Sequence, residues 1–182
     1  MVFDWVAAVP AGWRVFFLSM LPVTELRAAL PLGVLWGLVP RQAYLWALAG
    51  NLVPVLPLLL GLERLFSCLR FFGRGPVAAL ADYGRRRRDS LGSFSLPGLM
   101  ALVALPLPGT GVWTGCLVAA VLGLKKLPAA GAITLGAAAA GIAVGAGVAG
   151  VAAADRAGGK AAAIAAAAVL ASAYFLLLRK KR

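Results

Sequence analysis

Glu25 and Arg27 are the only charged residues in the stretch 15–40, which is otherwise almost wholly apolar. A charge at membrane depth costs at least about 2.5–3.5 kcal/mol, so it needs a partner, and its default interpretation is functional. A carboxylate there can carry a proton or hold a cation, and a guanidinium can balance it or contact an anion. Residues i and i+2 do not face each other on a helix, so pairing of these side chains predicts an unwound turn. The alternative is structural, with Glu25 capping free N–H groups of a broken helix and Arg27 neutralising it.

A second polar segment, Pro106-Leu-Pro-Gly-Thr-Gly-Val-Trp-Thr-Gly115, interrupts the uncharged stretch 90–124. Its glycines let a ligand or an opposing turn come close, and its threonine hydroxyls can form hydrogen bonds. The indole can stack on a cation, although a lone tryptophan more often packs. Asn51 is a further polar candidate, either as a lining residue or as an interhelical hydrogen bond. The candidate substrate- or ion-binding residues are therefore Glu25, Arg27, Asn51, Pro106, Pro108, Gly109, Thr110, Gly111, Trp113 and Thr114.

The sequence lacks the usual catalytic and metal-binding patterns. It has no histidine, and its two cysteines, Cys68 and Cys116, are far apart. No Ser/His/Asp, Cys/His or paired-carboxylate set can be assembled. We therefore expect no metal, no cofactor and no enzymatic activity.

The composition is that of a polytopic membrane protein. Of the 182 residues, 62% are hydrophobic and 13% are charged, whereas a soluble domain carries about 25% charged residues. The mean hydropathy is +0.92, and the stretches 42–62, 90–124 and 127–154 contain no charge. The net charge of +12 lies at the ends of apolar stretches, without a basic face interleaved with aromatics. This pattern indicates contact with anionic membrane lipids and not with nucleic acid.

The stretches 15–40 and 90–124 do not have the length of a single straight crossing. A hydrocarbon core of about 30 Å takes about 20 helical residues. The apolar arms of 15–40 have 10 and 13 residues, and two prolines bracket its charged centre. The 35 residues of 90–124 would form a helix of about 52 Å, and their proline–glycine centre is not compatible with a regular helix. We predict two re-entrant hairpins, with one kinked span as the alternative for 15–40.

The predicted fold is all-α, a single integral membrane domain over 1–182. An inverted repeat of a re-entrant helical hairpin plus a transmembrane helix is followed by an extra C-terminal transmembrane helix. A basic amphipathic helix on the membrane surface is expected within the linker. An ungapped offset of 84 residues, which aligns Leu21 with Leu105, is the sequence basis of the repeat. The expected segments are a first hairpin at 11–40, a transmembrane helix at 41–62, a basic cytoplasmic linker at 63–93, a second hairpin at 94–124, and transmembrane helices at 127–154 and 161–178.

The distribution of basic residues predicts the topology. With both hairpins re-entrant, 13 basic residues lie on the side of the C-terminus and 4 on the other side. A full crossing by 90–124 would make this split 9 to 8, so the positive-inside rule favours the second hairpin. For 15–40 the rule does not distinguish a re-entrant hairpin from a full crossing. We expect a multi-pass protein of the plasma membrane with a cytoplasmic C-terminus.

Small residues recur every four positions in the segment 127–154 and provide a face for close helix packing. This face serves packing within the chain or forms the seam of a homodimer. The residues are Ala137, Gly141, Gly145, Ala149 and Ala153.

The two polar segments together resemble the small multidrug export family of bacteria and archaea. The resemblance lies in Leu21-Pro-Val-Thr-Glu-Leu-Arg-Ala-Ala-Leu-Pro-Leu-Gly33 and in Leu105-Pro-Leu-Pro-Gly-Thr-Gly-Val-Trp-Thr-Gly115, and it covers roughly residues 10–150. It implies a transporter-like membrane fold with two facing re-entrant loops, as in the distantly related DedA/VTT membrane proteins. Those proteins carry arginines near their second loop, whereas this chain has none there.

The expected function is therefore secondary transport, coupled to protons, that exports small molecules. Glu25 would be the proton or substrate carboxylate, Arg27 its modulator or an anion contact, and 106–115 the opposing gate. One alternative is a DedA-like protein that scrambles or flips phospholipid or supports membrane homeostasis, because a Glu/Arg pair suits a zwitterionic headgroup. Another is a membrane partner or assembly factor that transports nothing.

Overall fold

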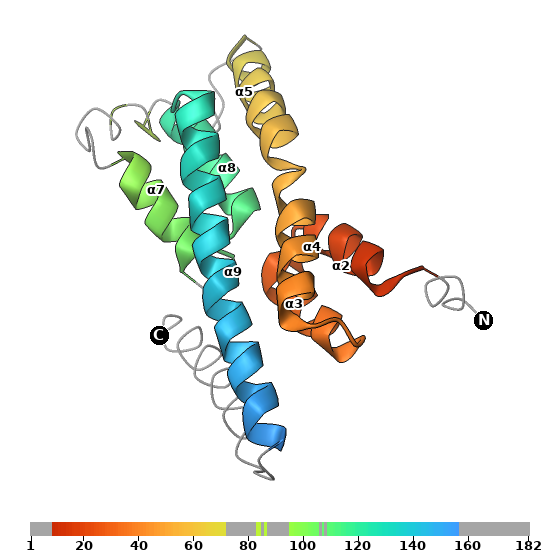
Figure 1. Cartoon of the computed structure of the whole chain (residues 1–182). Helices are drawn as coiled ribbons and strands as arrows, with labels where there is room; N and C mark the ends of the chain where they lie inside the picture. The colour runs from red at the N-terminus through yellow and green to blue at the C-terminus, as the bar shows by residue number, and fades with distance from the viewer. Residues whose placement is uncertain are drawn as a thin grey trace, which may run out of the picture.

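The computed structural model describes residues 9–71, 83–84, 86, 95–105, 107 and 109–156, in which helices are joined by turns and short loops (Figure 1). Two apolar segments are long enough to cross a membrane, Pro40–Leu62 and Lys126–Val151. The predicted helix at 161–178, most of the linker at 63–93, and both Pro106 and Pro108 lie outside the described residues.

The first pair of helices is α2 (Ala11–Met20) and α3 (Glu25–Leu35), which pack against each other. The break between them begins at Leu21, whose backbone is extended, with φ −76° and ψ 143°. Leu21 precedes Pro22, and the proline ring disfavours the helical conformation in the residue before it. The Thr24 hydroxyl donates a hydrogen bond back to the Leu18 carbonyl and ties the turn to α2. The predicted break is present, but it covers residues 21–24. Glu25 and Arg27 lie in the first turn of α3, so the prediction that they occupy an unwound turn is wrong.

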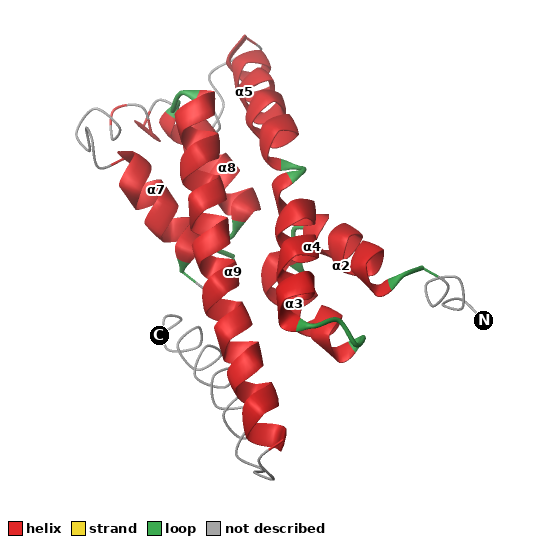
Figure 2. Cartoon of the chain, in the orientation of Figure 1, coloured by secondary structure: helices red, strands yellow, loops and turns green. Residues whose placement is uncertain are grey.

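The next two helices, α4 (Pro40–Leu52) and α5 (Val55–Phe71), cover the predicted span at 41–62. Val53 and Pro54 form a turn between them (Figure 2), because proline lacks the N–H that would continue the helix. The helix α5 then runs without a break to Phe71. Residues 63–71 therefore extend α5, where the sequence had predicted the start of a separate surface helix.

The second pair of helices is α7 (Ser95–Ala104) and α8 (Val112–Leu122), which also contact each other. The proline–glycine segment lies between them, as the sequence predicted. Gly123 ends α8 in a left-handed conformation with φ 62°, and its N–H bonds back to the last turn of that helix. A single long helix, α9 (Lys126–Arg156), follows.

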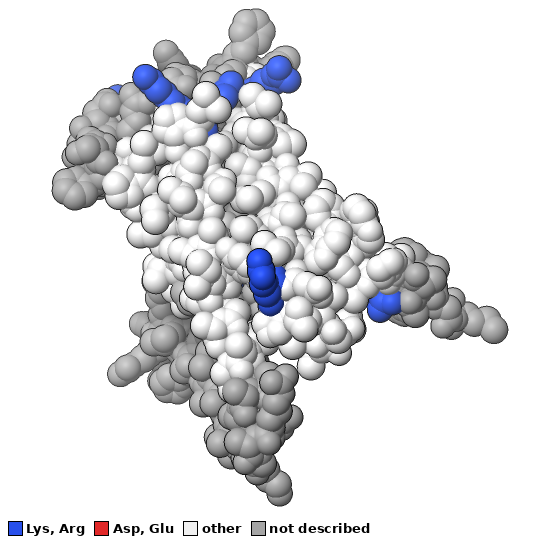
Figure 3. All heavy atoms as spheres, in the orientation of Figure 1, with Lys and Arg blue, Asp and Glu red and all other residues white. Residues whose placement is uncertain are grey.

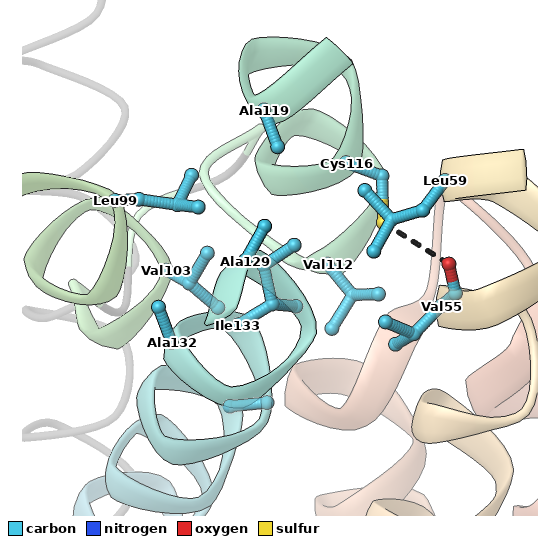
Figure 4. Close-up of a cluster of buried hydrophobic side chains, with 11 residues drawn as sticks. Val55, Leu59, Leu99, Val103, Val112, Cys116, Ala119, Ala129, Ala132 and Ile133 are labelled. Carbon is cyan, nitrogen blue, oxygen red and sulfur yellow. Dashed lines mark hydrogen bonds between the residues drawn. The ribbon is translucent and has the colours of Figure 1, made fainter. Parts of the chain in front are cut away.

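The two pairs of helices have similar surroundings. The helices α2 and α3 pack on α4, while α7 and α8 pack on α9. The halves are joined because α3 and α4 also contact α9, and α5 contacts α8. One apolar cluster lies among α2, α3 and α4, and another connects α5 with α7, α8 and α9. Figure 4 shows the second cluster, in which the Cys116 thiol on α8 points to the Val55 carbonyl of α5 at 3.8 Å.

Part of the small-residue stripe on α9 packs inside the described chain. Ala137 is buried, and a Cβ added to Gly141 would lie 2.6 Å from the Tyr44 ring of α4. A Cβ added to Gly145 would lie 3.8 Å from Leu30 of α3. These three residues therefore provide packing within the chain, and a homodimer seam remains a prediction.

The outer surface suits a lipid environment. Large apolar side chains are widely exposed, for example Val23 at 90%, Leu127 at 81% and Leu35 at 79%. Figure 3 shows a face that is mostly free of charge, with basic side chains gathered at the upper end. That is where the turn between α8 and α9 lies, with the exposed Lys125 and Lys126 (Figure 1).

Candidate functional site

Glu25 is the first residue of α3 and lies against the start of α8. Its side chain is only 8% exposed, and its backbone has a φ of +46°, which side-chain-bearing residues rarely adopt. Its Oε1 accepts a long hydrogen bond of 3.5 Å from the backbone N–H of Trp113. Trp113 is the second residue of α8, so this N–H has no partner within its own helix. The carboxylate therefore caps the positive end of a helix in the other hairpin.

Gly111 makes this close approach possible. Gly111 is buried, and a Cβ on it would overlap the carboxylate of Glu25. Any residue other than glycine here would displace the Glu25 carboxylate from its position beside the start of α8. The sequence predicted that a glycine in this segment would allow close contact, and the structure identifies which one.

Arg27, in the first turn of α3, reaches the opposite end of the break in the second hairpin. Its Nη2 donates hydrogen bonds to the carbonyl oxygens of Val103 at 3.0 Å and Leu105 at 2.6 Å. Its Nη1 donates to the Leu107 carbonyl and to the Thr110 hydroxyl, the latter at 3.1 Å. Val103 and Leu105 lie at the C-terminus of α7, where carbonyl groups lack helical partners and a positive charge is favourable.

The two charged residues are thus used separately. The side-chain hydrogen bonds of Glu25 and Arg27 go to the second hairpin and not to each other. The sequence-based expectation of direct pairing is replaced by an interlock, in which Arg27 binds the end of α7 and Glu25 binds the start of α8. The capping role that was the structural alternative for Glu25 is present, but the capped helix belongs to the other hairpin.

The other candidates in the second hairpin are mainly used to shape it. The Thr110 hydroxyl lies within 2.8 Å of the Leu105 carbonyl and 2.9 Å of the Leu107 carbonyl. Thr114 donates to the carbonyl of Gly109, which is exposed and has a φ of +82°. The indole N–H of Trp113 donates to the Met20 carbonyl at 3.2 Å. Trp113 therefore joins the second hairpin to the end of α2.

Asn51 on α4 completes the site. It is 3% exposed, and its Oδ1 has no hydrogen-bond donor among the described residues. A small cavity of about 10 Å³ brings Asn51 together with Glu25, Arg27 and Gly111. The remaining lining is apolar and comes from Leu26, Val103, Val112, Ala137 and Ala140. Four of the predicted residues therefore meet at one cavity, with Thr110 bonded to Arg27 beside it.

A comparison with models of protein families identifies the family of the chain. The model of the family described as "putative small multi-drug export protein" matches residues 25–143. The chain belongs to this family. None of the curated proteins and none of the solved structures matches it. The resemblance stated from the two polar segments is confirmed, and the matched range of the small multidrug export family contains every candidate residue from Glu25 to Thr114. The family description indicates a membrane transporter rather than an enzyme.

Several groups of the site were not predicted from the sequence of this chain. They are backbone carbonyls, namely those of Val103, Leu105 and Leu107 beside Arg27 and that of Met20 beside Trp113. Every residue has a carbonyl, so residue type carries no signal for this role. The available signal was the charge of Arg27 together with a break in a helix elsewhere, since unpaired carbonyls occur at helix ends.

Proposed function

We propose that this protein is a multi-pass secondary transporter of the plasma membrane that exports small molecules in exchange for protons. Glu25 carries the proton or binds the substrate, Arg27 holds the second hairpin in place, and the segment around 109–114 forms the opposing gate. The observation that carries this proposal is a nearly buried carboxylate between the two helix breaks, beside a cavity. Ionisable residues at membrane depth typically mark ion or substrate pathways.

The packing supports the proposed inverted repeat of re-entrant hairpins. The cytoplasmic C-terminus is proposed from the distribution of basic residues. In each half a pair of short helices packs on a longer helix, and the two breaks meet. Many secondary transporters place their binding site where broken helices of inverted repeats face each other, near the middle of the membrane. Non-helical backbone is tolerated there because it is enclosed by protein or lines a cavity.

The size of the cavity bears on the mechanism. At about 10 Å³ it has room for about one water molecule, whereas pockets for drug-sized ligands measure roughly 300–1,000 Å³. The described arrangement is then a closed state of the proposed cycle. Entry of a substrate separates the two hairpins and breaks the contacts of Arg27 and Trp113 across them.

The experiment that tests the proposal measures internal pH in proteoliposomes loaded with a proton-sensitive dye, with lipophilic cations added outside. The wild type should change the internal pH, and Glu25→Gln should abolish this change at equal protein content, because an amide cannot exchange the proton. The matched control is Glu63→Gln, which alters the only other glutamate of the chain and should retain the response.

Two results would contradict the proposal. An unaltered response in Glu25→Gln removes the assigned role of this carboxylate. No response of correctly inserted wild type to any of the cations removes proton-coupled export of such compounds.

A further inference from the structure

We propose that Asn51 is a positioning residue whose amide oxygen accepts a hydrogen bond from Glu25 when Glu25 is protonated, directly or through one water molecule. This inference rests on the proposed function, because it states how the transported proton is held at the same site. It concerns a contact between α3 and α4 and is independent of the identity of the exported compound.

The first observation is that the Asn51 Oδ1 atom is buried without a donor. Buried polar atoms in proteins are nearly always hydrogen-bonded, so an orphan acceptor calls for an explanation. Among the side chains that line the cavity, only Arg27 carries permanent N–H donors besides Asn51 itself. Both terminal nitrogens of Arg27 donate to the second hairpin. Besides the Nε–H of Arg27, protonated Glu25 is the remaining side-chain donor of the lining.

The second observation is that Glu25 has different partners available in its two states. The ionised carboxylate accepts a hydrogen bond from the Trp113 N–H and is stabilised by the positive end of α8. When a proton is added, one carboxyl oxygen becomes a donor and can satisfy an acceptor that the ionised form would only repel. Asn51 therefore stabilises the protonated form, while α8 stabilises the ionised form.

The third observation is the composition of the cavity. Its side-chain oxygens come from Glu25 and Asn51 alone, and the rest of the lining is apolar apart from Arg27. Calcium and magnesium take six or more oxygen ligands. A site with two such side chains next to a guanidinium is better suited to a proton than to a metal cation.

The ionisable groups around Glu25 are few in the described part of the chain. Arg27 lies on the same helix, the buried Cys116 lies on α8, and Tyr44 on α4 directs its hydroxyl to the Ala138 carbonyl at 3.4 Å. The cavity residues of α7 and α9 are Val103, Ala137 and Ala140, which carry no charge. In the proposed step Glu25 takes one proton from water on one side and returns it to water on the other, and no other bond changes.

Selective isotope labelling gives a direct test in the intact protein, because Asn51 is the only asparagine of the chain. Asparagine labelled at the side-chain carbonyl carbon and amide nitrogen would give one side-chain signal by solid-state NMR in lipid vesicles. In the wild type this signal should change with pH in a single titration, and in Glu25→Gln it should not change with pH. A signal that is independent of pH in the wild type, or that titrates equally in Glu25→Gln, would overturn the inference.

A second test uses dicyclohexylcarbodiimide, an apolar reagent that labels protonated carboxyl groups, with mass spectrometry of the Glu25 peptide. The tests are Asn51→Val and Asn51→Thr. Valine and threonine have nearly the same shape, but only threonine has a side-chain oxygen that can accept a hydrogen bond. Asn51→Val should lower the pH of half-labelling by about one unit, which corresponds to the loss of about one hydrogen bond to the protonated form. Asn51→Thr should restore most of this shift, and Gln42→Leu, which removes an exposed amide from the same helix, should leave it unchanged.

The outcomes separate this inference from the transport function. If the dye assay reports proton movement but Asn51→Val labels like the wild type, the role of Asn51 is wrong and the transport function stands. If the Asn51 signal titrates with Glu25 but none of the added cations changes the internal pH, the contact between Asn51 and Glu25 stands and the proposal of proton-coupled export is wrong. Protection of Glu25 from the reagent by sodium at constant pH would also overturn the inference, because a metal cation would then occupy the site.

Discussion

At the scale of residues, Glu25 and Arg27 act on opposite ends of one helix break. Arg27 provides donors for the carbonyls that α7 leaves unpaired, and Glu25 accepts from an N–H at the start of α8. Two residues from one turn of α3 thereby satisfy both ends of the interrupted helix in the other half. The unusual backbone of Glu25, with φ +46°, is of the kind that persists where surrounding contacts hold a residue in place, often at functional sites.

The first prediction concerns Gly111. In Gly111→Ala the added methyl group occupies the position of the Glu25 carboxylate, which must move away from the Trp113 N–H, so the free energy of unfolding should fall by about 1–3 kcal/mol because a buried polar group loses its hydrogen-bond donor. The measurement is thermal unfolding in detergent, together with the proteoliposome pH assay, in which activity should be lost. Gly98→Ala on α7 is the control, because a Cβ there has no neighbour within 4 Å. Equal stability and activity of the two variants would refute the close contact at Gly111.

The second prediction concerns the shape of the Arg27 side chain. Arg27→Lys retains the charge, but a single ammonium nitrogen cannot reach acceptors that two guanidinium nitrogens now serve. We expect a loss of about 2–3 kcal/mol in the free energy of unfolding, since hydrogen bonds to charged groups contribute about 1.5–3 kcal/mol each. Arg41→Lys, at an exposed position in the first turn of α4, should be neutral. Similar unfolding temperatures for both variants would show that the guanidinium geometry is not needed.

At the scale of elements, glycines set the distance between helices. A Cβ on Gly136 of α9 would lie 2.6 Å from the Met100 carbonyl oxygen and 2.9 Å from Val103 Cβ, both on α7. Such distances are shorter than van der Waals contact, so α7 would have to shift. Val103 also lines the cavity and offers its carbonyl to Arg27, so this helix contact supports the site.

The third prediction follows for the packing of α7 on α9. Gly136→Ala should lower the free energy of unfolding by about 1–3 kcal/mol, by overpacking. Gly131→Ala on the same helix meets no neighbour within 4 Å and should be neutral or slightly stabilising, because alanine has the higher helix propensity. Thermal unfolding of both variants in one detergent checks this, and an equal loss in Gly131→Ala would point to a general effect of glycine replacement.

The positions of the elements were largely predictable from prolines, glycines and charges. Pro22 and the segment around Gly109 mark the two breaks, and charged residues mark the ends of apolar stretches. The turn at Val53 and Pro54 within a predicted span and the extension of α5 to Phe71 were not predicted. Proline is tolerated inside many membrane helices, so Pro54 alone does not predict a turn within the span. The segment 63–71 is polar, but it contains no proline or glycine that would end a helix.

At the scale of the whole molecule, the predicted topology can be tested with single cysteines in a variant that lacks Cys68 and Cys116. If both hairpins are re-entrant, cysteines at Pro10 and Gly37 flank the first hairpin and should react with an impermeant maleimide from outside. Cysteines at Ser95 and Lys125 flank the second and should react from the cytoplasmic side. Labelling in right-side-out and inverted vesicles measures this, and reaction of Pro10 and Gly37 positions from opposite sides would show a full crossing.

How the halves meet could be predicted only in part. The predicted inverted repeat and the family resemblance both imply that Glu25 faces the segment 106–115. The sequence could not assign Asn51 to the same cavity, since a single amide in an apolar helix fits a lining role and an interhelical hydrogen bond equally well. Burial of the Asn51 Oδ1 atom without a donor is a property of the packed structure, which residue type does not reveal.

The interlock also has a consequence for how the chain is made. The acceptors of Arg27 lie 76 to 83 residues further along the chain. At a synthesis rate of roughly 5–20 residues per second, they emerge about 4–17 seconds after Arg27 itself. The first hairpin is therefore complete, with its two charges already at the membrane, before the atoms that will satisfy them have been translated.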